Sequence, residues 1–253
     1  MTVDRVAEIE KRVAVIAGAD TYVGPSLARL LATRNHDLVL ENPLPELVAE
    51  LTAAGTKVVS VSNPRGVDKH TQFTNLAAAA IDQFGRIDSA VAFSGAIIVG
   101  RFMKSTAADF ERAVDGCMLA PYHFLQAMLP SMIEARSGQI LVITSASAAR
   151  ATPGAPLYSA ARAGATHLVR NVAHEVASTG VQVNAVGTNY MDFDGFINAT
   201  GAQDPEVRAK IEAQVPMGRL GSMDEFAYFC SPFIDGTSTF TTGQFVSYAG
   251  GWA

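Results

Sequence analysis

The sequence predicts an α/β fold built on a parallel sheet of seven strands, and three observations support this. Apolar, β-rich runs alternate with helical patterns along the 253-residue chain. Hydrophobic residues make up 49% of the chain and charged residues only 17%, a balance typical of strands covered on both faces. Because no linker or block of charges divides the chain, residues 1–253 are expected to form a single doubly wound, Rossmann-like domain.

The strands and helices follow in regular order. The predicted strands are Arg12–Ala17, Asp37–Glu41, Lys57–Val61, Ile87–Phe93, Gln139–Thr144, Val181–Val186 and Gln244–Tyr248. The predicted helices are Pro25–Arg34, Pro45–Ala53, Asp68–Phe84, Thr106–Ala135, Ala155–Ser178 and Met223–Phe233. Right-handed crossovers then place the binding crevice beyond the carboxyl ends of the strands. Residues Asn189–Val215 break the alternation, which predicts a long substrate-covering loop with one or two short helices.

Composition limits the classes of partner. A net charge of −5 argues against nucleic acid and anionic membranes. Cys117 and Cys230 cannot form a disulfide framework, and no cysteine–histidine cluster indicates a metal. The charged segment Met1–Arg12 lacks the apolar core of a signal peptide, and no apolar run is long enough to span a bilayer. We expect a soluble cytoplasmic enzyme without a metal.

The turn after the first strand is unusual for a nucleotide-binding fold. Gly18 and Gly24 stand where such folds have a glycine-rich phosphate turn, but Tyr22 occupies the position at which the backbone approaches the pyrophosphate. A phenol there would fill the space of the phosphates. The alternative is that Tyr22 only packs against the turn.

Other positions that hold a dinucleotide in short-chain dehydrogenases are also changed. Asn63 follows the third strand where these enzymes usually have Asp, and Phe93-Ser94-Gly95 replaces their Asn-Asn-Ala-Gly. Gly187-Thr188-Asn189 replaces the Pro-Gly pair beside the nicotinamide. Glu41, at the end of the second strand, could still accept hydrogen bonds from ribose hydroxyls and so keeps NAD open. The balance of these changes predicts a protein that uses no cofactor.

A set of three polar residues follows the fifth strand. Ser145 is expected at its carboxyl end, and Tyr158 and Arg162 share one face of the next helix at positions i and i+4. The permanent charge of Arg162 favours the phenolate of Tyr158, which can then take a proton from a substrate hydroxyl held by Ser145. Ser147 is the competing serine. The twelve-residue gap before Tyr158 selects Ser145.

The sequence resembles the halohydrin dehalogenases, relatives of the short-chain dehydrogenases that lost their cofactor, over essentially the whole chain. Ser145, Tyr158 and Arg162 match the Ser-X12-Tyr-X3-Arg signature, and Tyr22 and Gly24 match the end of Thr-X4-Phe/Tyr-X-Gly. Residues 187–191 resemble the family's halide-binding loop, and the final Gly-Gly-Trp-Ala is similar to members in which a carboxyl-terminal Trp approaches a neighbouring subunit's site. The sequence departs from these signatures at Ala17 and Thr188.

The resemblance implies a halide and nucleophile site where the dehydrogenases hold the nicotinamide. It would be formed by Tyr22, Thr188, Asn189 and the backbone N–H groups of Tyr190 and Met191, although the Tyr190 side chain could equally serve loop packing. Phe93 and Ser147 are expected to line the substrate pocket.

The implied reaction converts a vicinal haloalcohol to an epoxide and halide, and in reverse opens an epoxide with a small anion. Two other functions remain open: an NAD(P)-dependent short-chain oxidoreductase with an atypical turn, and a non-enzymatic dinucleotide-sensing scaffold. Small and apolar residues on several faces of the helices Thr106–Ala135 and Ala155–Ser178 predict assembly into dimers or a homotetramer.

Overall fold

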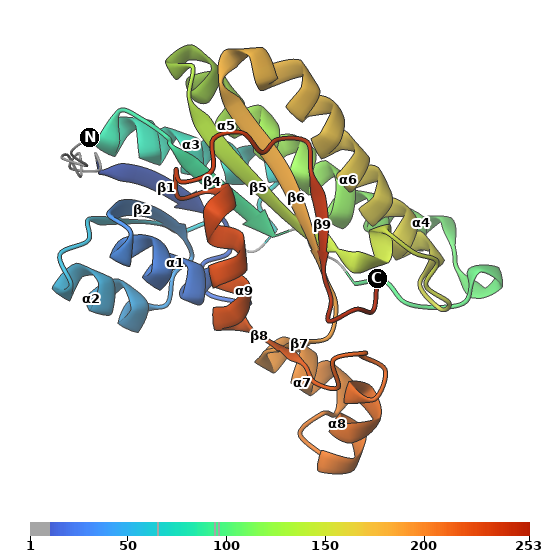
Figure 1. Cartoon of the computed structure of the whole chain (residues 1–253). Coiled ribbons are helices and arrows are strands. Elements are labelled where there is room, and N and C mark those ends of the chain that lie inside the picture. Colours follow the sequence, from blue (N-terminus) through green and yellow to red (C-terminus); the bar gives the residue numbers. More distant parts are fainter. Residues whose placement is uncertain (1–10, 65, 94, 96) are drawn as a thin grey trace, which may run out of the picture.

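The computed structural model describes residues 11–64, 66–93, 95 and 97–253 and confirms the predicted α/β fold (Figure 1). Its main sheet has seven strands in the order β3-β2-β1-β4-β5-β6-β9, and every neighbouring pair is parallel. The strands are β1 Arg12–Ile16, β2 His36–Glu41, β3 Val58–Val61, β4 Ser89–Phe93, β5 Gly138–Ser145, β6 Val181–Thr188 and β9 Phe245–Tyr248. Residues 1–10 of the charged amino-terminal segment, and Ser94, lie outside the described residues.

Helices cover both faces of the sheet. They are α1 Gly24–Thr33, α2 Pro45–Ala53, α3 Lys69–Phe84, α4 Ala107–Val114, α5 Ala120–Ala135, α6 Pro156–Val176, α7 Asp194–Thr200, α8 Pro205–Glu212 and α9 Met223–Cys230. Side chains of α3, α5 and α6 form the core on one face, and those of α1, α2 and α9 form the core on the other. All eight residues of β5 are buried, which explains why this central strand reads as a nearly continuous apolar run.

The strand order reverses between β1 and β4, and ligands of doubly wound folds bind beyond the carboxyl ends of the strands at this point. The register of β5 with β6 pairs Ser145 with Thr188. The last residues of two central strands therefore meet at this edge of the sheet.

The prediction of one long helix over Thr106–Ala135 is wrong. A π-helical turn at Asp115–Leu119 separates α4 from α5, and the Ala120 N–H bonds back to the Asp115 carbonyl. Pro121 explains the break, because proline has no N–H to donate and its ring collides with the carbonyl four residues earlier. Widening the turn by one residue removes that conflict.

The irregular segment after β6 contains the two predicted short helices, α7 and α8. Figure 1 shows them standing away from the main sheet, beyond the carboxyl ends of its strands. A small parallel pair, β7 (Met191–Asp192) with β8 (Gly221–Ser222), joins the two ends of this segment and was not predicted. We call residues 189–222 the lid. No helix in the described part of the chain is long and apolar enough to cross a membrane.

Candidate active site

Ser145 lies at the end of β5 with only 5% of its surface exposed. Its Oγ accepts hydrogen bonds from the backbone N–H of Ser147 at 3.2 Å and from Ser147 Oγ at 2.9 Å. With both acceptor positions of its oxygen used, the Ser145 hydroxyl donates its own hydrogen toward the Thr188 carbonyl at 3.4 Å. This contact is long, so the proton is available to a substrate oxygen. Ser147, predicted to line the substrate pocket, donates one of these bonds to Ser145.

Tyr158 and Arg162 occupy one face of α6, as predicted from their spacing. The Arg162 guanidinium carbon lies 4.8 Å from the centroid of the Tyr158 ring. Arg162 is 4% exposed, so its charge acts in a poorly hydrated setting. The ring of Tyr158 packs against a small buried cluster that includes Cys117 and Ala161. This packing holds the phenol in place beside the cation.

Tyr22 reaches from the turn after β1 to the end of β6. Its hydroxyl forms a 2.7 Å hydrogen bond with Thr188 Oγ1, although its backbone has the left-handed φ of 54°. The ring makes edge contacts with Phe93 at 5.9 Å and Phe193 at 4.8 Å between centroids, and lies 6.0 Å from Phe226. Burial raises the pKa of the Tyr22 phenol well above its ordinary value, while Tyr158 and Arg162 lie near enough to act on it electrostatically. Tyr22 thus stays neutral at the centre of the site.

Glu41 ends β2, and from the sequence its carboxylate could accept hydrogen bonds from ribose hydroxyls. Its Oε2 accepts the Gly18 N–H at 2.9 Å, and its Oε1 accepts from Asn63 Nδ2 at 2.9 Å and Gln72 Nε2 at 2.7 Å. Glu41 is 3% exposed. Its carboxylate therefore already holds three donors from within the chain.

These contacts decide whether a nicotinamide dinucleotide fits. At the adenosine end, the carboxylate that would take ribose hydroxyls is bonded to the turn and to two side-chain amides. At the nicotinamide end, the Tyr22 ring and its bond to Thr188 cross the space between β1 and β6. The residues present do not fit this cofactor. The described residues also hold no group of three or more potential metal ligands.

The predicted anion loop is only partly directed at this site. Thr188 contacts Tyr22, whereas the Tyr190 hydroxyl donates to Gln214 Oε1 at 2.9 Å, within the lid. Met191 is buried in the core beneath the sheet's carboxyl edge. Asn189, which follows Thr188 in the sequence, is half-buried. The Tyr190 and Met191 side chains thus serve packing, which leaves their backbone N–H groups as candidates.

The carboxyl terminus packs on its own chain. Arg150 donates to the Trp252 carbonyl at 2.6 Å, and its guanidinium lies 4.4 Å from the Trp252 ring. The Trp252 ring also makes an edge contact with Tyr190 at 5.8 Å between ring centroids. Sequence reasoning missed Arg150 and Gln214, since neither belongs to a local motif. Phe193 and Phe226 were also missed, because aromatic residues in a lid and a helix carry no local signal of a shared cluster.

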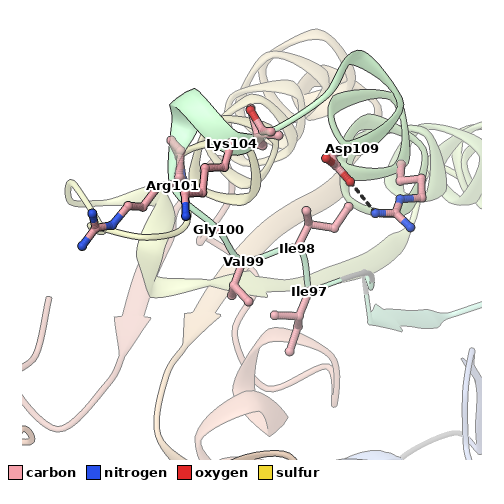
Figure 2. A pocket seen from close by; sticks show the side chains of 11 residues that line it. Ile97, Ile98, Val99, Gly100, Arg101, Lys104 and Asp109 are labelled. Atoms are coloured by element: carbon pink, nitrogen blue, oxygen red, sulfur yellow. Dashed lines mark hydrogen bonds and ion pairs between the residues drawn. The ribbon is translucent and has the colours of Figure 1, made fainter.

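A cavity of about 400 Å³ opens on the outer side of α6. Figure 2 shows it between residues 97–105, the first turns of α4 and the start of α6, with Asp109 and Arg112 paired at 2.5 Å on its rim. Leu157, the neighbour of Tyr158 in the sequence, lines this cavity. None of the predicted site residues lines it. The chemistry is therefore expected at the carboxyl edge of the sheet and not in this cavity.

Comparisons with known proteins agree with this fold. Residues 18–253 match the family model described as enoyl-(acyl carrier protein) reductase. The chain belongs to the short-chain dehydrogenase/reductase family. It is 25% identical over 243 residues to the 3-oxoacyl-[acyl-carrier-protein] reductase of Staphylococcus epidermidis, covering 94% of this chain and 97% of the relative.

Solved structures of the same fold include enzymes of two kinds. A structure described as a dehalogenation enzyme is similar with a TM-score of 0.84 and 26% identity, covering 96% of this chain and 98% of that one. The crystal structure of levodione reductase is similar with a TM-score of 0.84 and 24% identity, covering 95% of this chain and 97% of that one. This similarity shows the shared fold alone. Within this short-chain dehydrogenase/reductase, the closed cofactor crevice is the feature that separates the two possible chemistries.

Proposed function

We propose that this short-chain dehydrogenase/reductase relative is a cofactor-independent halohydrin dehalogenase. It would convert vicinal haloalcohols to epoxides with release of halide, and open epoxides with small anions in the reverse direction. The observation that carries the proposal is the Tyr22–Thr188 hydrogen bond, which crosses the nicotinamide space next to Ser145, Tyr158 and Arg162. The likeness to a dehalogenation enzyme supports it.

The site's residues account for each part of the reaction. Tyr158, with the Arg162 cation beside its ring, takes the proton of the substrate hydroxyl as the general base, while Ser145 donates a hydrogen bond to the same oxygen. The oxygen then forms a bond to the neighbouring carbon from behind. The carbon–halogen bond breaks, and the halide leaves with its electron pair. No covalent intermediate with the protein is needed.

The leaving halide needs donors that are not already used. Tyr22 and Thr188 share one hydrogen between their hydroxyl oxygens, and either can be the donor. The hydrogen of the accepting hydroxyl is therefore left to point at an anion. Two neutral hydroxyls, with Asn189 and the N–H groups of residues 190 and 191, form a site that suits a weakly basic anion.

An NAD(P)-dependent oxidoreductase is the second candidate. It is favoured by the relatives, because the Staphylococcus epidermidis protein is a reductase and the matched family model is described as one. This function requires Tyr22 to leave Thr188 and Glu41 to release its donors. The two candidates therefore differ in one measurable property, the affinity for a nicotinamide cofactor.

We also propose that the chain assembles as a homotetramer and binds neither nucleic acid nor membranes. Four large apolar side chains are exposed on α4 and α5 or beside them. Phe110 on α4 is 48% exposed, and Leu119, just before α5, is 42% exposed. Tyr122 and Ile133 on α5 are 44% and 37% exposed. Large apolar side chains in this number on adjoining helices are typical of a surface that packs against another copy. Light scattering at micromolar concentration is expected to show no monomer.

Halide release from a simple vicinal bromoalcohol, with no nicotinamide added, tests the function. We expect the wild-type chain to release bromide. The rate of bromide release should fall at least about 100-fold in Tyr158→Phe, because a general base contributes about 10²–10⁴-fold to the rate. Tyr228→Phe, on an exposed part of α9, is the matched control and should retain the activity. Saturable NADH or NADPH binding at micromolar concentration, without bromide release, would establish the oxidoreductase instead.

A further inference from the structure

Glu41 is a buried charge to which the proposed reaction assigns no role. It ends β2, is 3% exposed, and its carboxylate accepts from Gly18, Asn63 and Gln72 at 2.9, 2.9 and 2.7 Å. Burying a charge is costly unless hydrogen bonds replace its water. These three bonds do so, and they join the turn after β1 to the segment after β3 and to α3.

The two side-chain amides are fixed in the orientation that serves Glu41. Asn63 Oδ1 accepts from Asn75 Nδ2 at 3.1 Å, and Gln72 Oε1 accepts from Lys69 Nζ at 3.2 Å. Because each amide oxygen already has a donor, each amide nitrogen is turned toward the carboxylate. The carboxylate thus lies in a site built to hold it.

The same residue holds the turn through its backbone and its side chain. The Glu41 carbonyl accepts the Ala19 N–H at 2.9 Å, next to the Gly18 N–H that the carboxylate accepts. Gly18 has the left-handed φ of 72°, and a Cβ on Gly24 would lie 2.6 Å from the Gly18 carbonyl oxygen. The start of α1 therefore rests directly on the part of the turn that Glu41 fixes.

Tyr22 lies between these two glycines, so the position of Gly18 determines where its hydroxyl points. We propose that Glu41 is a positioning residue that holds the turn so that Tyr22 remains on Thr188 and forms the anion pocket. This inference rests on the proposed function. Glu41 itself touches neither substrate nor anion, and it acts only through the turn.

The first test measures epoxide opening by azide in Glu41→Ala and Glu41→Gln. We expect the KM for azide to rise about tenfold in Glu41→Ala while kcat changes less than about threefold, because a binding group is displaced and the base is not. Glu41→Gln should give a smaller rise. Its single amide oxygen can serve Gly18 or the two side-chain amides, but not both.

Asp88→Asn is the matched control. Asp88 is also buried, at 5% exposure, and its carboxylate accepts the backbone N–H of Val13 at 2.8 Å near the opposite end of β1. This variant should lower stability and leave the KM for azide unchanged. A KM rise of the same size in the control would show that loss of stability, and not of positioning, explains the effect.

The second test measures amide hydrogen exchange of residues 18–23 and needs no turnover. Exchange there should be faster in both Glu41 variants than in the wild type and in Asp88→Asn. If the wild type opens no epoxide, the proposed function fails, and only the hydrogen-exchange measurement tests the role of Glu41. Unchanged exchange rates of residues 18–23 in both Glu41 variants would then overturn the inference. If the wild type is active, a KM for azide within about twofold of wild type in both Glu41 variants overturns it. If Glu41→Ala does not fold, Glu41→Gln decides in the same way.

Discussion

Replacing Tyr22 tests the proposal that its ring and its bond to Thr188 form an anion site in place of a nicotinamide cofactor. Tyr22→Phe removes the 2.7 Å bond to Thr188 and keeps the ring among Phe93, Phe193 and Phe226. A buried neutral hydrogen bond contributes about 0.5–1.5 kcal/mol net. Loss of about 1 kcal/mol corresponds to a fall in Tm of about 2–4 °C for a chain of this size. The same loss of about 1 kcal/mol at the proposed anion site would raise the KM for azide about fivefold.

Tyr22→Gly removes the ring as well. Loss of a buried aromatic side chain costs about 3–5 kcal/mol, and relief of the left-handed φ of 54° returns about 1 kcal/mol, so a net loss of about 2–4 kcal/mol is expected. Chemical denaturation measures both variants. Titration with NADH, followed by its fluorescence, shows whether opening this space admits a cofactor.

Tyr248→Phe is the control for the ring cluster. Its ring lies 5.0 Å from Phe226, but its hydroxyl makes no hydrogen bond to the described residues. It should therefore change neither the KM for azide nor the stability appreciably. If Tyr22→Phe also leaves the KM for azide unchanged, the hydroxyl is not part of the anion site. Micromolar binding of NADH by Tyr22→Phe would show that the ring does not block the cofactor, and both results would refute the reasoning.

Three further predictions concern the groups around this site. Ser147→Ala removes one donor to Ser145, so kcat should fall about 2–10-fold. Ser145→Ala should lower kcat by at least about 100-fold. Equal losses of kcat in steady-state assays would contradict this difference. Burial raises the pKa of both the Cys230 thiol and the Tyr22 phenol, so at alkaline pH the unfolded chain binds fewer protons than the folded chain. The free energy of unfolding should be highest below about pH 9 and fall as the pH rises further, with a shallower fall in Tyr22→Phe; urea titrations at several pH values measure this. Arg150→Ala should red-shift the emission of Trp252, the only tryptophan of the sequence, and increase its quenching by acrylamide; unchanged spectra would show that the contact does not persist in solution.

The fold could be predicted because its signals are local. Continuous apolar runs such as β5 indicate strands buried on both faces, and their alternation with helical patterns fixes a parallel sheet. The helix over 106–135 was predicted as one because its apolar pattern continues across the break. The proline at 121 carried the missing signal. Pairing of β7 with β8 depends on two residues at each end of a long segment, and no local pattern shows it.

The same distinction separates the parts of the site. Tyr158 and Arg162 meet because a helix brings i and i+4 together, so their spacing was sufficient. The position of Glu41 at the end of the second strand left a contact with ribose hydroxyls open. Its actual partners lie 23, 22 and 31 residues away in sequence. Tyr190 was assigned to the anion loop, and its contact with Gln214 likewise depends on how the lid folds back.

The cofactor crevice is closed at both ends by interactions that share one turn. Glu41 holds Gly18 at the adenosine end, and Tyr22, four residues further on, closes the nicotinamide end through Thr188. A dinucleotide would have to displace both sets of hydrogen bonds before gaining any of its own. Loss of the Tyr22 ring leaves the Glu41 end closed, because the donors to Glu41 are Gly18, Asn63 and Gln72 and not Tyr22. Tyr22→Gly alone should therefore not restore NADH binding, whereas a chain that also lacks the Glu41 carboxylate loses both closures.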